Sequence, residues 1–223
     1  ELIIGATPTF GRGKFLDANT NATAETTSPT SFPFAVYGVF GLKKVEKLKF
    51  GLAVYTPFGS TIEWEAGWTG RFALTRLELR SIFVQPTVSY KLTDKIGFGA
   101  GFIYSTGKVN LQKDIPVLGA DGNYGHAELN GAASGFGFNA GLYFKPTEKL
   151  SLGLSYRSQV TMKVDNGEAT FTVPSALAGN FPSGKFSSQL PLPQVLTLGS
   201  AYKINEKLDL ALDVNFVPSI NSK

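Results

Sequence analysis

Residues 93–105 decide the fold, and they read Thr-Asp-Lys-Ile-Gly-Phe-Gly-Ala-Gly-Phe-Ile-Tyr-Ser. The stretch begins with a polar tight turn and continues as an alternation of large and small residues. Ile96, Phe98, Phe102 and Tyr104 face one way, glycines face the other way, and Ile103 is the exception. A period of two residues is the signature of a β-strand.

The same turn recurs in three other segments, at residues 45–52, 147–154 and 205–212. The lysines of the four turns are Lys47, Lys95, Lys149 and Lys207, so the spacings are 48, 54 and 58 residues. A slowly varying period of this size indicates a repeated unit of one hairpin and one loop. Each turn is therefore expected to join two antiparallel strands.

The face opposite the large residues is rich in glycine, serine and alanine. In a soluble sheet that face meets water and favours lysine, glutamate and threonine. A sheet whose large apolar residues face lipid, and whose small and polar residues line an enclosed lumen, explains both faces. The composition agrees, because only 17% of the residues are charged, against about 25% in ordinary soluble domains.

The lengths of the connections are a second, independent observation. Short turns lie near residues 43–47, 93–95, 146–149 and 205–207, and they alternate strictly with long connections at residues 17–31, 59–70, 113–131 and 165–190. Short periplasmic turns at one rim and long extracellular loops at the other are typical of outer-membrane barrels. The sequence therefore predicts an all-β protein, an antiparallel transmembrane β-barrel of the outer-membrane type.

The pattern predicts nine strands. Their ranges are about 2–14, 32–42, 48–58, 72–92, 96–112, 132–145, 149–164, 193–204 and 207–217. Single-chain bacterial barrels have even strand numbers. We therefore expect residues 1–223 to be a single but incomplete β-barrel domain.

The composition excludes several classes of site. No cysteine is present, so a disulfide scaffold, a cysteine zinc site and thiol catalysis are excluded, and one histidine, His126, cannot supply a metal site of several imidazoles. Lys and Arg are scattered singly, so nucleic acid is not an expected partner. No cofactor and no catalytic residue is expected, because Glu78, Asp209 and Asp213 have no nucleophile or acid–base partner at a defined spacing. A signal peptide is expected to lie outside this sequence.

Four segments carry a resemblance to a known family. They are residues 48–59, 85–95, 150–160 (Leu-Ser-Leu-Gly-Leu-Ser-Tyr-Arg-Ser-Gln-Val) and 190–194. Their order is similar to that of the FadL family, outer-membrane transporters of long-chain fatty acids and other hydrophobic compounds in Gram-negative bacteria. The resemblance implies a monomeric barrel of about fourteen strands, plugged by an N-terminal hatch with an Asn-Pro-Ala motif. This sequence has no Asn-Pro-Ala, so the hatch and the C-terminal strands are expected to lie outside it.

The resemblance also implies a route for the ligand. Hydrophobic molecules such as fatty acids or hydrocarbons would be captured by extracellular loops and released sideways through the barrel wall, with outer-membrane lipid or detergent around it. The opening is expected at an inward kink that matches Tyr55, Thr56, Pro57, Phe58 and Gly59. Proline removes a donor from the strand ladder and glycine permits a bend. The alternative is that Pro57 and Gly59 only end a strand.

Two further sets of residues are candidates for ligand contact. The apolar residues of the third and fourth long loops are expected to bind ligand, and they are Ile115, Val117, Leu118, Leu129, Phe171, Val173, Leu177 and Phe181. Polar residues expected in the lumen are Arg76, Glu78, Arg80, Asn139, Arg157, Asp209, Asp213 and Asn215. The alternatives are that the apolar residues close the loops by packing together and that the charges satisfy one another.

Two other functions stay open at the level of sequence. One is a non-specific porin or structural barrel, and the other is a soluble lipid-binding β-barrel or sandwich. The first differs from a transporter in conducting ions steadily, and the second would stay monodisperse without detergent.

Overall fold

The computed structural model describes residues 1–218, and almost all regular structure in them is β-strand. The elements are β1 (Leu2–Ala6), β2 (Lys14–Leu16), β3 (Thr23–Glu25), β4 (Phe34–Leu42), β5 (Val45–Tyr55), β6 (Gly59–Glu63), β7 (Arg76–Lys91), β8 (Ile96–Leu118), β9 (Tyr124–Phe144), β10 (Leu150–Arg157), β11 (Val160–Thr172), the 3-10 helix η1 (Ser175–Asn180), β12 (Gly184–Leu192), β13 (Val195–Asn205) and β14 (Leu208–Phe216). Among the described residues, no helix has the length and apolar character needed to cross a membrane.

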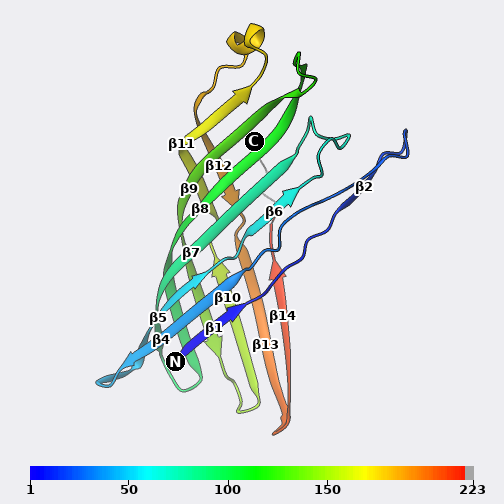
Figure 1. Cartoon of the computed structure of the whole chain (residues 1–223). Helices are drawn as coiled ribbons and strands as arrows, with labels where there is room; N and C mark the ends of the chain where they lie inside the picture. The colour runs from blue at the N-terminus through cyan, green and yellow to red at the C-terminus, as the bar shows by residue number, and fades with distance from the viewer. Residues whose placement is uncertain (219–223) are drawn as a thin grey trace.

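The main sheet is antiparallel and confirms the predicted nine-strand wall. Its strand order is β1-β4-β5-β7-β8-β9-β10-β13-β14. Three further strands join this sheet off that path, because β6 pairs with β7, β11 pairs with β9, and β12 pairs with β11. β2 and β3 form a separate hairpin. Short turns gather at the lower end in Figure 1 and long connections at the upper end, as the sequence predicted. Over residues 1–218 the sheet does not close, because β1 and β14 are the two ends of this path.

The recurring turn has a local physical cause. The Thr93 hydroxyl accepts hydrogen bonds from the backbone N–H groups of Lys95 (3.2 Å) and Ile96 (3.0 Å). Thr147 does the same for Lys149 (3.3 Å) and Leu150 (3.0 Å). These side-chain oxygens satisfy donors that a tight turn leaves without a strand partner. In these two turns the threonine two residues before the lysine therefore specifies where the chain reverses.

The strands extend farther than the sequence predicted. The connection predicted over residues 113–131 is mostly ladder, because β8 runs to Leu118 and β9 begins at Tyr124. The strand predicted over 149–164 is two strands, β10 and β11, and the connection predicted over 165–190 contains most of β11 and β12. Two other strands are shorter than predicted. The strand predicted over 2–14 ends at Ala6, and the strand predicted over 72–92 begins at Arg76. Apolar periodicity weakens where a strand leaves lipid, which explains these errors.

Contacts across the sheet identify its concave, inner face. The Arg157 guanidinium of β10 lies 5.9 Å from the centroid of the Phe83 ring on β7, although β8 and β9 separate these strands in the sheet. Side chains of such distant strands can meet only on the concave side of a curved sheet. Phe83 pairs with Ser105 on β8, so odd-numbered residues of β7 and β8 face inward and even-numbered residues face outward.

The outward face of β7 and β8 marks a lipid-facing band. It runs from the pair Tyr90 and Phe98 at the lower end to the pair Ile82 and Thr106 at the upper end. This is about nine residues of β7, the length expected for a tilted transmembrane strand. Tyr104 and Phe136 lie side by side near the upper limit, 5.4 Å between ring centroids, where aromatic residues flank a hydrocarbon band.

Candidate functional site

The apolar face of the sheet changes sides above the lipid-facing band. In β8 the outward residues are apolar up to Tyr104 and polar from Thr106 on, as in Lys108, Asn110 and Gln112. The inward residues change in the opposite sense, from glycines below Ile103 to mostly apolar residues above Gly107, with Lys113 as the exception. The register of β7 with β8 is continuous from Arg76 to Lys91, so the change comes from the sequence and not from a slipped strand. The extracellular part of the wall is therefore polar outside and apolar inside.

A buried apolar cluster begins at the level of this change. Phe83 of β7, Ile103 of β8 and Met162 of β11 are 0% exposed, and Val160, Val164, Ala133 and Leu192 complete the cluster. Tyr55 and Phe58, from the predicted opening, pack against it. Ile103 is the residue that breaks the alternation in the sequence, and its place in this cluster is the reason.

One cation lies beside the cluster. The Arg157 guanidinium is 5.2 Å from the centroid of the Phe58 ring, within reach of a cation–π contact. Arg157 takes part in no ion pair among residues 1–218. The Ser105 hydroxyl, fully buried in the same region, has no hydrogen-bond partner within the described chain.

The chain between β5 and β6 bends at Thr56, Pro57 and Phe58. Tyr55 pairs with Phe83 and Gly59 with Arg80, so three residues here oppose two on β7, which is a β-bulge. The β7 side is anchored, because the Phe58 carbonyl accepts hydrogen bonds from the Ser81 hydroxyl (2.7 Å) and N–H (3.2 Å).

The other side of the bend is a gap in the wall. The ladder between β4 and β5 ends where the Thr56 N–H donates to the Phe34 carbonyl (3.1 Å). Hydrogen bonding resumes at Glu63, whose N–H donates to the Ser28 hydroxyl (3.1 Å) and whose carbonyl accepts from the Thr27 N–H (2.7 Å). Between these points lies a cavity of about 340 Å³, lined by residues 29–34 on one side and by Thr56, Phe58–Thr61 and Leu79–Ile82 on the other. Its lining includes inward Ser81 and outward Ile82, so the cavity reaches both faces of the wall.

The structure brings several of the predicted capture residues together, and three of them, Ile115, Leu129 and Phe171, lie on strands and not on loops. Ile115 of β8 and Val173 flank Gly125 of β9, and Leu129 pairs with Ala169 of β11. Ile115 is buried, and the Phe171 and Phe181 rings lie 6.1 Å apart. Leu177 lies in η1, and Val117 and Leu118 lie at the tip of β8, where Leu118 is 60% exposed.

The tip between β8 and β9 is ordered by a polar turn. The Asp121 carboxylate accepts hydrogen bonds from the Asn123 side chain (2.9 Å) and backbone N–H (3.1 Å). These bonds favour the ionised carboxylate, and they lower the pKa of Asp121 below its usual value. The turn therefore stays compact while Asp121 is ionised.

Five of the predicted lumen residues share the inner face. Asn139 pairs with Arg157, Asp213 pairs with Gly199, and Asn215 accepts a hydrogen bond from the Thr197 hydroxyl (2.6 Å). Asp209, opposite Lys203, lies on the same face of β14. With Gly97, Gly99 and Gly153, several of these residues line a trough of about 410 Å³.

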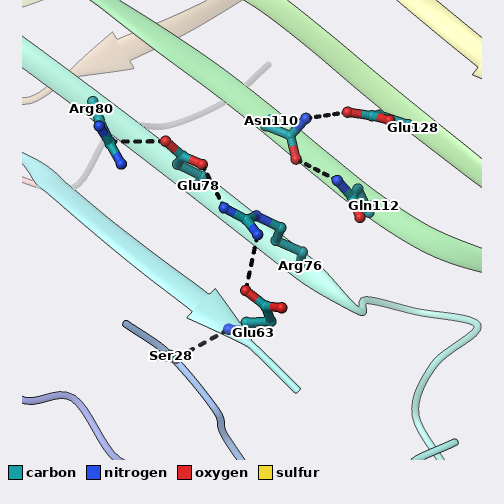
Figure 2. Close-up of polar contacts among 8 residues, drawn as sticks. All are labelled: Ser28, Glu63, Arg76, Glu78, Arg80, Asn110, Gln112 and Glu128. Carbon is teal, nitrogen blue, oxygen red and sulfur yellow. Dashed lines mark hydrogen bonds and ion pairs between the residues drawn. The ribbon is translucent and has the colours of Figure 1, made fainter. Parts of the chain in front are cut away.

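The expectation for Arg76, Glu78 and Arg80 was wrong as to the face. They share the outward face with Val84 because the β7 register continues without a bulge. Figure 2 shows their network: Arg76 donates to Glu63 and Glu78 (both 2.9 Å), and Arg80 Nε pairs with Glu78 (2.8 Å). They lie above the lipid-facing band, where outward charges do not meet hydrocarbon.

Sequence reasoning missed the centre of the site. Phe83, Val160, Met162 and Ser81 were not singled out, since each is an ordinary strand residue when seen alone. The signal that was present in the sequence was the exchange of apolar and polar positions in β8 above Ile103.

Comparison with known proteins places this arrangement in a family. A family model described as outer membrane protein transport protein (OMPP1/FadL/TodX) matches residues 4–218. The long-chain fatty acid transport protein of Salmonella typhi is 23% identical over 82% of this chain and 50% of its own length. A putative outer membrane protein of Neisseria meningitidis is 28% identical over 80% of this chain and 45% of its own length. The chain spans about half the length of the curated relatives it matches.

Solved structures show the same fold. A Pseudomonas aeruginosa FadL homologue has a TM-score of 0.73 at 19% identity, covering 87% of this chain and 50% of that one. The Ralstonia pickettii toluene transporter TbuX has a TM-score of 0.68 at 15% identity, covering 97% and 61%. These relatives are transporters of the Gram-negative outer membrane and not enzymes. The match over residues 4–218 and the shared barrel wall establish that the chain belongs to the outer membrane protein transport family OMPP1/FadL/TodX.

Proposed function

We propose that this chain forms part of a channel that carries small hydrophobic molecules, such as fatty acids or hydrocarbons, across the outer membrane. The ligand contacts the apolar inner surface above the membrane, reaches the buried cluster around Phe83, and leaves sideways through the gap at residues 56–61. This proposal rests on the continuity of the cluster and the gap, because Phe58 packs against the cluster and also lines the gap. Membership of an outer-membrane family excludes the soluble alternative.

The free energy of an apolar ligand favours a sideways exit. Each methylene that passes from an apolar surface into water costs about 0.8 kcal/mol. An exit into the periplasm would expose the whole ligand, whereas an exit through the wall transfers it to lipid. The gap fits this route, because Ile82 on its lining is also the uppermost outward apolar residue of β7.

The charge in the cluster suits a ligand with an acidic head group. Arg157 is the cation beside the Phe58 and Phe83 rings, and a guanidinium binds a carboxylate through two parallel hydrogen bonds. A neutral hydrocarbon makes only the apolar contacts. Arg157 is therefore expected to increase the affinity for acidic substrates but not for neutral ones, although both follow the same path.

A reversible cross-link across the gap tests the route. These 223 residues contain no cysteine, so Ser31→Cys and Ser60→Cys place reactive thiols on opposite banks of the gap. In the protein expressed in full from its own gene, a short disulfide-containing bis-maleimide linker should stop uptake of a radiolabelled fatty acid into cells, and reduction should restore it. Uptake that continues with the linker in place would contradict sideways release.

The matched control places the same linker away from the gap. Ser155→Cys and Thr197→Cys lie opposite each other on β10 and β13, on the inner face. Linking them tethers two strands that are already paired, and uptake should continue. A steady, ion-permeable current through the unmodified protein in planar bilayers would favour the porin alternative instead.

A further inference from the structure

The outer surface carries a basic row beside the gap, and the two lysines of the row lie outside the lining of the gap. Arg80 of β7 and Lys108 of β8 are direct cross-strand neighbours on the outward face. Lys163 of β11 faces the same way, because it pairs with Ser134, which in turn pairs with Thr106 next to Lys108. All three side chains are exposed, Arg80 to 70%. We call Arg80, Lys108 and Lys163 the outer basic row.

The row lies at one height relative to the membrane. Directly below it are Ile82, Tyr104 and Phe136, the last large apolar residues on the outward face of β7, β8 and β9. Above it every outward residue of β7 is charged, and those of β8 are polar up to Asp114. The register of β7, β8 and β9 is continuous through this level, so the three cations face outward at the upper limit of the hydrocarbon.

The local anions neutralise only part of the row, because Arg80 is paired with Glu78 and the two lysines are not paired. Glu78 is the carboxylate nearest to Arg80, its side chain is 8% exposed, and its two oxygens are engaged by Arg76 Nη2 (2.9 Å) and Arg80 Nε (2.8 Å). Arg76 is shared in turn with Glu63 (2.9 Å). Lys108 and Lys163 form no ion pair within residues 1–218.

We propose that the outer basic row binds the phosphate groups of the outer-leaflet lipid, the glucosamine-based lipid A. Its phosphates lie where the acyl chains end, which is the level of the row, while Tyr104 and Phe136 contact the chains below. Cations at an anionic membrane surface attract head groups, and a row on adjacent strands spaces the charges along the wall. The binding would hold the wall at a defined depth and fix the height of the gap, whose lining includes Arg80.

The test measures binding of purified lipid A, with both phosphates or with both removed, to the detergent-solubilised protein expressed in full, by native mass spectrometry. The variant is Lys108→Gln with Lys163→Gln. The control is Lys47→Gln with Lys207→Gln, which removes two exposed lysines at the opposite rim, one at the start of β5 and one in the turn before β14. Each lost cation should weaken binding roughly five-fold, so the double variant should lose about twenty-five-fold and the control should lose nothing.

The outcomes separate the possible explanations. Lipid A without phosphates should bind the unchanged protein as weakly as phosphorylated lipid A binds the double variant, and Lys108→Arg with Lys163→Arg should bind normally. Equal losses in variant and control, or equal binding of both forms of lipid A, would overturn the proposal. Displacement of lipid A by an excess of inorganic phosphate would show a site for the free anion and would also overturn it. If the double variant fails to fold, the two single variants carry the same test.

Discussion

At Ile103 the apolar residues of β8 change from one face of the sheet to the other. Below it the inward positions are glycines, and above Gly107 they include Val109, Leu111 and Ile115. A single strand thus presents an apolar surface to the outside in one half and to the inside in the other half. The same alternation of residues supports both environments, because only the phase of the apolar positions changes.

The backbones of β7 and β8 approach so closely at Gly107 that a larger residue there would destabilise the sheet. A Cβ at Gly107 would overlap the Arg80 carbonyl of the neighbouring strand, whereas nothing lies within 4 Å of a Cβ at Gly153. We expect Gly107→Ala to lower the free energy of unfolding by about 1–3 kcal/mol. Urea unfolding in lipid vesicles measures the loss. Gly153→Ala is the control and should be neutral, and equal stability of both variants would contradict the close approach.

Removal of the cation beside the Phe83 ring should lower the uptake of acidic substrates and leave the uptake of neutral substrates unchanged. Arg157→Gln keeps much of the side chain but loses the guanidinium. We expect uptake of a long-chain fatty acid to fall by about ten-fold, because a hydrogen bond between charged groups contributes about 1.5–3 kcal/mol. Uptake of toluene should stay unchanged, as measured with radiolabelled substrates in cells. An equal fall for both substrates would show a structural role for Arg157 instead.

At the scale of elements, the strands bend where the two halves of the wall meet. The chain breaks at residues 56–58 between β5 and β6, at 158–159 between β10 and β11, and at 193–194 between β12 and β13. The first break faces the Phe83 pair, and the second lies beside Phe138, whose N–H donates to the Ser158 hydroxyl (2.9 Å). Bulges and prolines interrupt ladders without ending a sheet. The half with its apolar face outward and the half with its apolar face inward can therefore differ in orientation.

The position of the lipid band can be tested with two lysines on one strand. Phe102 is outward on β8 near the middle of the band, and Gln112 is outward above it. Phe102→Lys should destabilise the protein by about 2–4 kcal/mol, because a cation at the membrane midplane loses its hydration. Gln112→Lys should change little. Unfolding in vesicles measures both, and similar values would show that the band is misplaced.

At the scale of the whole molecule, the curved sheet presents two edges. β1 and β14 end the nine-strand path, and the outward residues of β14 from Leu208 to Phe216 are large and apolar. An edge strand with such a face pairs with another strand or aggregates. A wall that spans a membrane also needs every backbone group bonded. The edges of this sheet are therefore expected to be covered in the membrane.

Hydrogen exchange measures whether β14 is covered. In the protein expressed in full and held in lipid, the amides of residues 208–216 that do not bond to β13 should exchange as slowly as those that do. In the short turn at residues 205–207, beside β14, exchange should be fast and serves as the internal reference. Fast exchange along one side of β14 would mean that its edge stays open.

Much of the wall could be predicted from the sequence, because its determinants are local. The turn that Thr93 and Thr147 cap, the period of two and the alternation of short and long connections each depend on residues close together in the chain. They predicted the nine strands, and also the inward side of Asn139, Arg157, Asp209, Asp213 and Asn215. The inward kink at Tyr55–Gly59 was expected from the family resemblance, and the bulge found at these residues is consistent with the local effect of Pro57 and Gly59 on their own backbone.

What only the tertiary structure decided is which residues meet across the lumen. The contact of Arg157 with Phe83, the cluster around Met162 and the gap opposite residues 29–34 join segments that are far apart in sequence. The sequence by itself determined that large and small residues alternate, but the side of the wall that each set faces depends on register and curvature. That is why the sequence did not predict the outward position of Arg76, Glu78 and Arg80. It is also why the site, whose residues meet only across the curved sheet, could not be predicted.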